Sequence, residues 1–237
     1  MTATFKILMI LTSHSVLGVA GHTTGVWLEE LTTPYYAFVD AGVHVDIASI
    51  DGGRIPIDSA SMQPIGKNPA SVERFLKDTA AMGRFEHSLK VEGLSAKGYD
   101  AVFLPGGHGT MWDTATSKAL ATLLSQAWAD GKVLAAVCHG PAGLVNVKDV
   151  TGKPLVAGRH VSAFSNEEEL ATGLDKVVPF LLETRLRELG AHYESGAKFH
   201  PFALRDGKLV TGQNPASSEL VALLTLEALR EKNGEGK

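Results

Sequence analysis

Apolar runs recur along the chain and alternate with segments of helical spacing. Six runs have the length and composition of strands: KILMILT (6–12), HVDIASI (44–50), AVFLPGG (101–107), KVLAAVC (132–138), HVSAF (160–164) and KLVTG (208–212). Short apolar runs bounded by glycine and turn residues are typical of buried parallel strands. Between them, apolar residues recur at helical spacing over 25–41, 114–130, 178–189 and 216–231. The alternation predicts an α/β fold, with a mostly parallel sheet and helices on both faces.

Segment 51–98 interrupts this alternation after the second predicted strand. It begins with DGGRIPIDSASMQPIGKNP, which is rich in glycine and proline, and continues with a helix-like stretch. The segment is longer than an ordinary connection between a strand and a helix. We therefore expect a single domain over residues 1–237, with an insertion or partial lid at 51–98.

The composition indicates a soluble globular protein. Of the 237 residues, 44% are hydrophobic and 20% are charged, and the formal net charge is −4. The sequence has no basic stripe of the kind that would predict binding to nucleic acid or to an anionic membrane. The apolar run 6–12 is too short to span a bilayer, and we interpret it as a buried strand rather than a signal peptide. A single cysteine excludes a disulfide framework, so we expect a reducing compartment, the cytoplasm.

That cysteine, Cys138, ends an apolar run in AAVCHGPAG. Gly140 and Pro141 predict a tight turn into a helix that begins near Ala142. A thiol at this junction would face the helix's first amides, which favour the thiolate. Many α/β hydrolases present their nucleophile on such an elbow. Free cysteines often only fill space in a core, but that role needs neither the adjacent histidine nor the glycine turn.

A catalytic thiol needs a base and a group that stabilises an oxyanion. His139 follows the cysteine and can supply either a ring base or a backbone N–H. The loop LPGGHGT (104–110) has three glycines, which let backbone amides approach a bound carbonyl oxygen. The predicted oxyanion and substrate-binding residues are Gly106, Gly107, His108 and Trp112.

Two acidic clusters can supply a carboxylate. Glu29 and Glu30 lie in a predicted helix among apolar neighbours. A buried glutamate has a raised pKa and can stay protonated, so it can donate a hydrogen bond to a thiolate. We expect Glu29 to be solvated, whereas the periodicity does not decide whether Glu30 points into the core or to solvent.

The second cluster, Glu167, Glu168 and Glu169, follows the run 160–164 and starts a predicted helix. Acidic residues in a first turn usually serve the helix dipole, which we expect of at least two of them. Ser165 or Asn166 can cap the helix. A glutamate reaching back to His139 would complete a Cys-His-Glu arrangement.

Four segments together resemble one family. They are TGVWLEELTTP (24–34), FLPGGHGTMWD (103–113), AAVCHGPAGL (135–144) and LVTGQNPASS (209–218). Their combination is similar to the DJ-1/PfpI superfamily, and most of all to its Hsp31-like branch. The resemblance implies a flavodoxin-like α/β sandwich.

The resemblance also implies roles for individual residues. Cys138 matches the nucleophile, His139 its histidine neighbour, and Glu30 the glutamate that contacts the thiol. Glu169 matches the acidic member of the triad, with Glu168 as the alternative. Gly107 falls where the family has its oxyanion amide.

The Hsp31-like branch converts methylglyoxal to D-lactate without glutathione or metal, and deglycase and holdase chaperone activities are also associated with it. The resemblance therefore implies a glyoxalase III-type lyase (D-lactate dehydratase) for stress protection, with a small 2-oxoaldehyde substrate and no cofactor. Relatives commonly form dimers, so we expect a homodimer.

Other interpretations remain open. A holdase would bind unfolded protein clients on an apolar patch, and a redox sensor would use the thiol as an oxidisable switch. A class I glutamine amidotransferase-like amidase or peptidase shares this fold, and His192-Tyr193-Glu194 offers its late H-x-E, which we interpret as structural. His14, His22, His108, His139 and Glu30 have no metal-binding spacing, so we predict no metal site.

Overall fold

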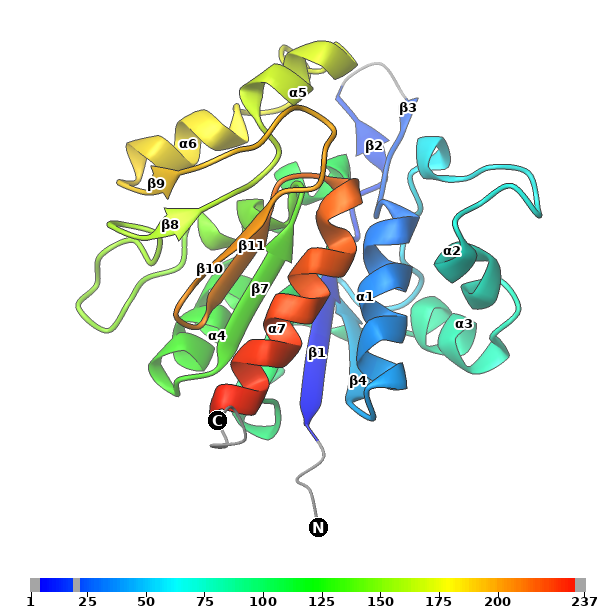
Figure 1. Cartoon of the computed structure of the whole chain (residues 1–237), viewed down its shortest axis with the longest axis horizontal. Coiled ribbons are helices and arrows are strands. Elements are labelled where there is room, and N and C mark those ends of the chain that lie inside the picture. The colour runs from blue at the N-terminus through cyan, green and yellow to red at the C-terminus, as the bar shows by residue number, and fades with distance from the viewer. Residues whose placement is uncertain (1–4, 19–21, 233–237) are drawn as a thin grey trace.

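The computed structural model describes residues 5–18 and 22–232. Within these residues a seven-stranded sheet forms the centre of the molecule. Its strands are β1 (Lys6–Leu11), β4 (His44–Ser49), β5 (Leu89–Lys90), β6 (Ala101–Leu104), β7 (Val133–Val137), β10 (Ala203–Asp206) and β11 (Leu209–Gly212). Their order is β10-β11-β7-β6-β1-β4-β5, and every pair is parallel except β10 with β11 (Figure 1).

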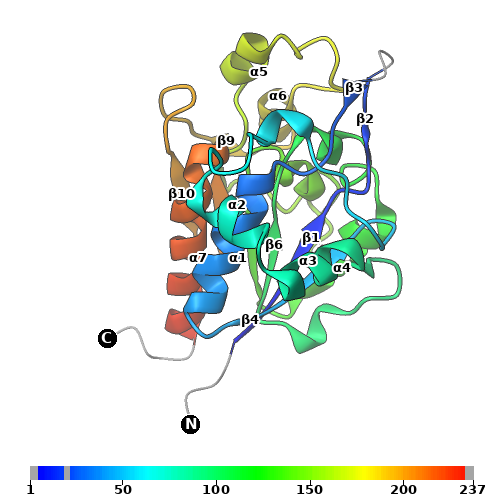
Figure 2. The same ribbon diagram turned by 90° about the vertical axis from the view of Figure 1, so that its right-hand side faces the viewer.

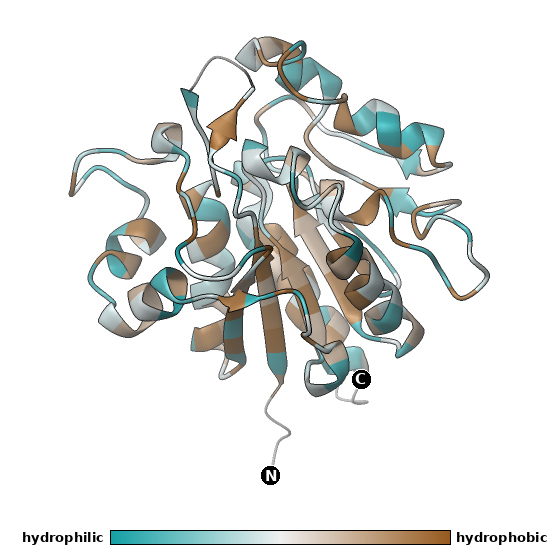
Figure 3. Cartoon of the chain, turned by 180° about the vertical axis from the view of Figure 1, so that it is seen from behind, coloured by the Kyte–Doolittle hydropathy of each residue, from teal (hydrophilic) through white to brown (hydrophobic). Residues whose placement is uncertain are grey.

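Helices cover both faces of this sheet. Helices α1 (Leu28–Asp40) and α7 (Ser218–Lys232) lie side by side on one face, and α4 (Lys118–Ala129) lies on the other (Figure 1). Alternate residues of β1 point to opposite faces, so Ile7 and Met9 join one core while Leu8 and Ile10 join the other. This double burial explains why the central strands are apolar throughout (Figure 3). The predicted α/β fold is confirmed.

Segment 51–98 forms an insertion beside α1. It contains two short helices, α2 (Ala70–Phe75) and α3 (Thr79–Glu86), and ends in β5 and a 3-10 turn, η2 (Ala96–Gly98). Phe75 and Phe85 meet edge to face, with ring centroids 5.6 Å apart, and both belong to the core under α1. Helix α2 packs on the outside of α1, and α3 lies next to α2 and β4 (Figure 2).

A cap of short elements lies beyond the carboxyl ends of the parallel strands (Figure 1). It includes α5 (Asn166–Thr172), α6 (Leu182–Glu188), and two small sheets, β2 (Val16–Leu17) with β3 (His22–Thr23) and β8 (His160–Val161) with β9 (His192–Tyr193). We expected the run 160–164 to join the central sheet, and this is wrong. Only two of its residues are extended and they pair with β9, while the amide of Ser162 donates to the Thr211 hydroxyl instead of a strand carbonyl.

Within the part of the chain that the structure describes, no helix combines the length and apolar character needed to cross a membrane.

Candidate active site

The chain makes a strained elbow at Cys138. Strand β7 ends at Val137, and Cys138 has a φ of 59°, in the left-handed region that L-residues rarely occupy. Its amide donates to the Gly212 carbonyl (2.9 Å), and its carbonyl accepts from the Phe164 amide (2.8 Å). A Cβ on Gly140 would lie 2.1 Å from the Leu104 carbonyl oxygen, so glycine is required where the turn packs on β6. The predicted elbow is confirmed.

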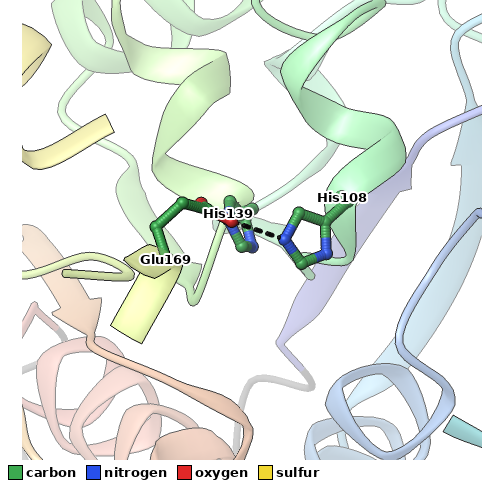
Figure 4. Close-up of side chains that lie close together, drawn as sticks. All are labelled: His108, His139 and Glu169. Carbon is green, nitrogen blue, oxygen red and sulfur yellow. Dashed lines mark hydrogen bonds and ion pairs between the residues drawn. The ribbon is translucent and has the colours of Figure 1, made fainter. Parts of the chain in front are cut away.

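The elbow brings the side chains of Cys138 and His139 together, although they are adjacent in sequence. Sγ lies 3.3 Å from His139 Nδ1, and His139 Nε2 lies 2.7 Å from Glu169 Oε2. The other oxygen of Glu169 lies 2.9 Å from His108 Nε2 (Figure 4). All four side chains are buried. The result is a Cys-His-Glu chain with a second histidine on the same carboxylate.

The surroundings fix the charge of Glu169. Burial opposes its ionisation, but hydrogen bonds from His108 and His139 outweigh burial and hold its pKa far below the usual range. Glu169 is therefore a carboxylate that accepts from both imidazole Nε2–H groups.

His139 is neutral. Burial lowers its pKa first, and the nearby His108 lowers it further. Since Nε2–H donates to Glu169, Nδ1 carries the lone pair that faces the Cys138 thiol. His139 is therefore positioned to act as a base toward the sulfur, with its single ring proton on Nε2.

Glu30 approaches the thiol from helix α1. It is fully buried, and burial raises its pKa to about 8, against hydrogen bonds with Cys138 and the Gly106 amide. Oε2 accepts from Gly106 N–H at 2.8 Å, whereas Oε1 is buried without a partner of normal hydrogen-bond geometry. At neutral pH Glu30 is therefore mostly protonated and can donate a proton.

The enclosure of the Cys138 thiol opposes its ionisation. Burial raises the pKa of the thiol above its usual value, and the hydrogen bond from the His139 amide opposes this shift. This direction of the pKa disfavours the predicted resting thiolate. The predicted helix after the elbow is only a 3-10 helix of five residues, η4 (Gly140–Leu144), and the sulfur is enclosed beside an acidic group.

A cavity of about 150 Å³ opens onto this cluster. Its lining consists of Trp27, Glu30, Gly107, His108, Cys138, His139, Phe164, Thr172, Phe199 and Pro215. Three aromatic rings and the catalytic side chains form most of the wall. The space suits a small molecule with an apolar part.

The sequence can now be placed among known proteins. The family model described as DJ-1/PfpI family matches residues 16–228. The chain belongs to the DJ-1/PfpI family. It is 31% identical over 237 residues to the glutathione-independent glyoxalase HSP31 of Saccharomyces cerevisiae, covering 95% of this chain and 98% of that protein.

Two solved structures are similar to this chain in both fold and sequence. Glyoxalase III of Candida albicans superposes with a TM-score of 0.87 at 29% identity, over 94% of this chain and 97% of that one. The Rapid Encystment Protein 24 KDa of Francisella tularensis gives a TM-score of 0.90 at 38% identity, over 95% and 99% of the two chains.

Most residues predicted from the DJ-1/PfpI resemblance meet at the cavity: Cys138, His139, Glu30, Gly107 and His108 line it, and Glu169 lies behind the two histidines. Gly107 has a φ of 100°, and a Cβ there would lie 2.2 Å from the Gly25 carbonyl oxygen. No described residue accepts a hydrogen bond from its amide, so this N–H is available to a ligand.

Two predicted substrate contacts are not found. The amide of Gly106 donates to Glu30, so this residue positions the glutamate and does not line the cavity. Trp112 also lies outside the lining, and its ring stacks on His14 with centroids 5.1 Å apart. The tryptophan at the cavity is Trp27.

Segment 51–98 covers no part of this cavity. None of its residues, all of which are described, appears in the lining. The segment packs on α1 through α2, away from the residues that line the cavity. The lining also includes Phe164, Thr172, Phe199 and Pro215, which sequence patterns did not single out.

The three consecutive glutamates have different surroundings. Glu167 is exposed and forms an ion pair with Lys198 (3.6 Å). Glu168 forms a capping box with Ser165 and points away from His139, which leaves Glu169 as the acid of the triad. Glu29, which we expected to be solvated, is half-buried, and burial raises its pKa.

Metal ligands were not expected from sequence spacing, yet three buried side chains come close together. The ligand atoms of His108, His139 and Glu169 lie within 4.8 Å of one another. His14, His22 and Glu30 are not part of this group. His192 and Glu194 lie at the small β8–β9 sheet, where Glu194 contacts His160, so the H-x-E motif is away from the cavity lining, as predicted.

Proposed function

We propose that the protein is a glutathione-independent glyoxalase that converts methylglyoxal-type 2-oxoaldehydes to 2-hydroxy acids, as a lyase of the D-lactate dehydratase kind. The observation that carries this proposal is the Cys138 thiol placed between a neutral histidine and a protonated glutamate at a small cavity. The names of the yeast and Candida relatives support it.

The first step is addition of the sulfur to the aldehyde carbon. His139 Nδ1 takes the thiol proton as the S–C bond forms, and the imidazolium is stabilised by the Glu169 carboxylate. The imidazolium then passes this proton to the aldehyde oxygen, which becomes the hydroxyl of a hemithioacetal held by the Gly107 amide, and His139 is neutral again. Because burial opposes ionisation of the thiol, its proton leaves as the electrophile reacts.

The second step moves a proton between two carbons. His139 removes the hydrogen of the former aldehyde carbon as a proton and passes it to the ketone oxygen, which gives an enediol. Glu30 then donates its proton to the neighbouring carbon and takes up the hydroxyl proton of the former aldehyde carbon, which becomes the carbonyl of a thioester. Water cleaves this thioester, which releases the 2-hydroxy acid and restores the thiol. One carbon is oxidised while its neighbour is reduced, so the balance is 2-oxoaldehyde plus water to 2-hydroxy acid.

The direct test supplies methylglyoxal without glutathione and follows D-lactate with a stereospecific dehydrogenase. The parent protein is expected to form D-lactate, and Cys138→Ala is expected to form none above the uncatalysed rate. Glu167→Gln, which changes an exposed glutamate outside the cavity, is the matched control and should retain full activity. A parent protein inactive on methylglyoxal and on larger 2-oxoaldehydes would refute the proposal.

The alternatives make different demands on the site. A peptidase must admit a polypeptide to the nucleophile, and a cavity of about 150 Å³ is small for that purpose. Binding of unfolded clients, dimerisation and a cytoplasmic location stay predictions from the sequence. The holdase activity would survive Cys138→Ala, since a surface patch does not need the thiol.

A further inference from the structure

Phe199 stands between solvent and the catalytic thiol. Its side chain lines the same cavity as Cys138, yet the residue is 48% exposed. Its ring centroid lies 6.4 Å from that of Phe164, which in turn packs on His139 at 4.4 Å. One side of Phe199 therefore faces water, and the other faces the space where a substrate would sit.

The backbone at Phe199 is strained. Its φ is 60°, and within the described residues only Cys138 shares a positive φ among non-glycine residues. A phenylalanine in the left-handed region is unfavourable, so it persists only where the surroundings enforce it. Both strained residues lie at this one cavity.

Glu168 enforces the conformation. This glutamate is fully buried, and its Oε1 accepts from the Phe199 amide (2.7 Å) and from Asn214 Nδ2 (2.8 Å). Its Oε2 accepts from the Ser165 amide and hydroxyl, both at 3.0 Å. A buried carboxylate that four neutral donors satisfy is a firm anchor. It ties the helix that carries Glu169 to Phe199.

The loop that carries Phe199 has few buried anchors besides Glu168. Residues 194–201 are all exposed and lack regular structure. The Gly196 amide donates to Gln213 Oε1 (2.8 Å), and Asn214 Nδ2 donates to the His200 carbonyl (2.8 Å). At the surface, the Glu194 amide donates to the Val161 carbonyl (2.9 Å), the Glu194 side chain contacts His160, and Lys198 pairs with Glu167 (3.6 Å). Asn214 itself depends on Glu168. Loosening Glu168 would therefore release the ring from the mouth of the cavity.

We propose that Phe199 is the residue that sets substrate size and access at Cys138, and that Glu168 is the positioning residue that holds it there. For turnover, this inference rests on the proposed glyoxalase function. The ring limits the group attached to the ketone carbon of the 2-oxoaldehyde and shields the hemithioacetal from water.

The first experiment does not depend on glyoxalase activity. Cys138 is the only cysteine, so its alkylation can be followed by intact mass, with iodoacetamide as the small reagent and N-benzylmaleimide as the bulky one. Phe199→Ala should raise the rate of alkylation by the bulky reagent about tenfold and the rate by the small reagent far less, because pocket size discriminates between ligands on this scale. Phe199→Trp should slow the bulky reagent.

The matched control is Leu170→Ala. Leu170 is an exposed apolar residue (61%) on α5 and does not line the cavity, so both alkylation rates should stay at the parent value. Equal acceleration of both reagents by Phe199→Ala, or no acceleration of either, would overturn the assignment of Phe199 as a size filter.

Glu168→Gln tests the anchor at nearly constant volume. An amide offers one acceptor oxygen where the carboxylate serves four donors, so the Phe199 or the Ser165 contacts must weaken. We expect faster alkylation by the bulky reagent and a higher KM with a smaller change in kcat. Glu92→Gln, at an exposed glutamate that pairs with Lys90 and lies outside the cavity lining, should change neither. A fall in kcat alone, with alkylation at the parent rate, would show that Glu168 does not act through Phe199.

Substrate preference provides the second readout. The ratio of kcat/KM for phenylglyoxal to that for methylglyoxal should rise about tenfold in Phe199→Ala. An unchanged or lower ratio would contradict the size filter. If no variant turns over any 2-oxoaldehyde, the proposed function fails, and the alkylation rates still decide the role of Phe199.

Discussion

At the scale of single residues, two buried glutamates of the site differ in protonation because their surroundings differ. Glu169 has two imidazole donors and is a carboxylate, whereas Glu30 is enclosed against a thiol and keeps its proton near neutral pH. His139 stays neutral between them. One base and one acid therefore face a single sulfur, which is the requirement for moving a proton between adjacent carbons.

The raised pKa of Glu30 predicts a pH-dependent stability. Its folded pKa, about 8, lies above the unfolded value of 4.5, so its stability contribution is fully present below pH 4.5 and is lost as pH rises to about 8. Glu30→Gln has no such titration. Between pH 4.5 and pH 8 its free energy of unfolding should therefore rise by a few kcal/mol relative to that of the parent. Urea unfolding across this range measures it. Parallel curves for the two proteins would contradict a protonated Glu30.

The triad predicts that neighbouring glutamates differ sharply in importance. Glu169→Gln keeps the side-chain volume but removes the charge that orients His139 and stabilises its protonated form, so kcat should fall by about 10²–10⁴. Glu167→Gln should leave kcat within about twofold, because surface substitutions rarely matter. Steady-state kinetics compare the two. Similar losses in both variants would remove Glu169 from the mechanism.

At the scale of elements, the ends of the parallel strands bring the site together. The loop after β6 carries Gly106 and Gly107, and the loop after β7 carries Cys138. Glu30 lies in the first turn of α1 and contacts the Gly106 amide. Apolar runs predicted these strands because burial on both faces leaves a strong pattern. They did not predict β10, since its sequence ALRD is half-buried and polar at an edge. The run 160–164 is apolar because Val161, Ala163 and Phe164 are buried in the two cores, although the run does not join the central sheet.

The close packing of the elbow predicts opposite effects of two glycine substitutions. In Gly140→Ala the new Cβ would lie 2.1 Å from the Leu104 carbonyl oxygen, so unfolding stability should fall by about 2–3 kcal/mol. In Gly83→Ala, inside α3, the Cβ meets nothing within 4 Å, and stability should rise by up to about 1 kcal/mol. Denaturant midpoints measure both. Equal behaviour of the two variants would contradict the packing described for η4.

At the scale of the whole molecule, contacts between distant segments explain what the sequence could not reveal. Cys138 and His139 were recognisable because the motif is local. The choice of Glu169 over Glu168 depends on which glutamate reaches His139 in the folded chain. The role of Phe199 depends on its hydrogen bond to Glu168, which Asn214 also contacts. Burial of the sulfur, which disfavours the predicted resting thiolate, is likewise a property of the folded protein.

Dimerisation also belongs to this scale and remains a prediction from the family resemblance. The chain mass is 25.1 kDa, so light scattering of the purified protein should give twice that value. A mass of one chain at micromolar concentration would contradict the homodimer.

The central claim is that one sulfur carries the turnover of 2-oxoaldehydes. The most direct measurement modifies Cys138 stepwise with iodoacetamide, determines the modified fraction by intact mass, and assays D-lactate formation from methylglyoxal at each step. The account predicts that activity falls in proportion to the unmodified fraction and reaches the uncatalysed rate at full modification. Activity that persists when every Cys138 is alkylated would contradict it.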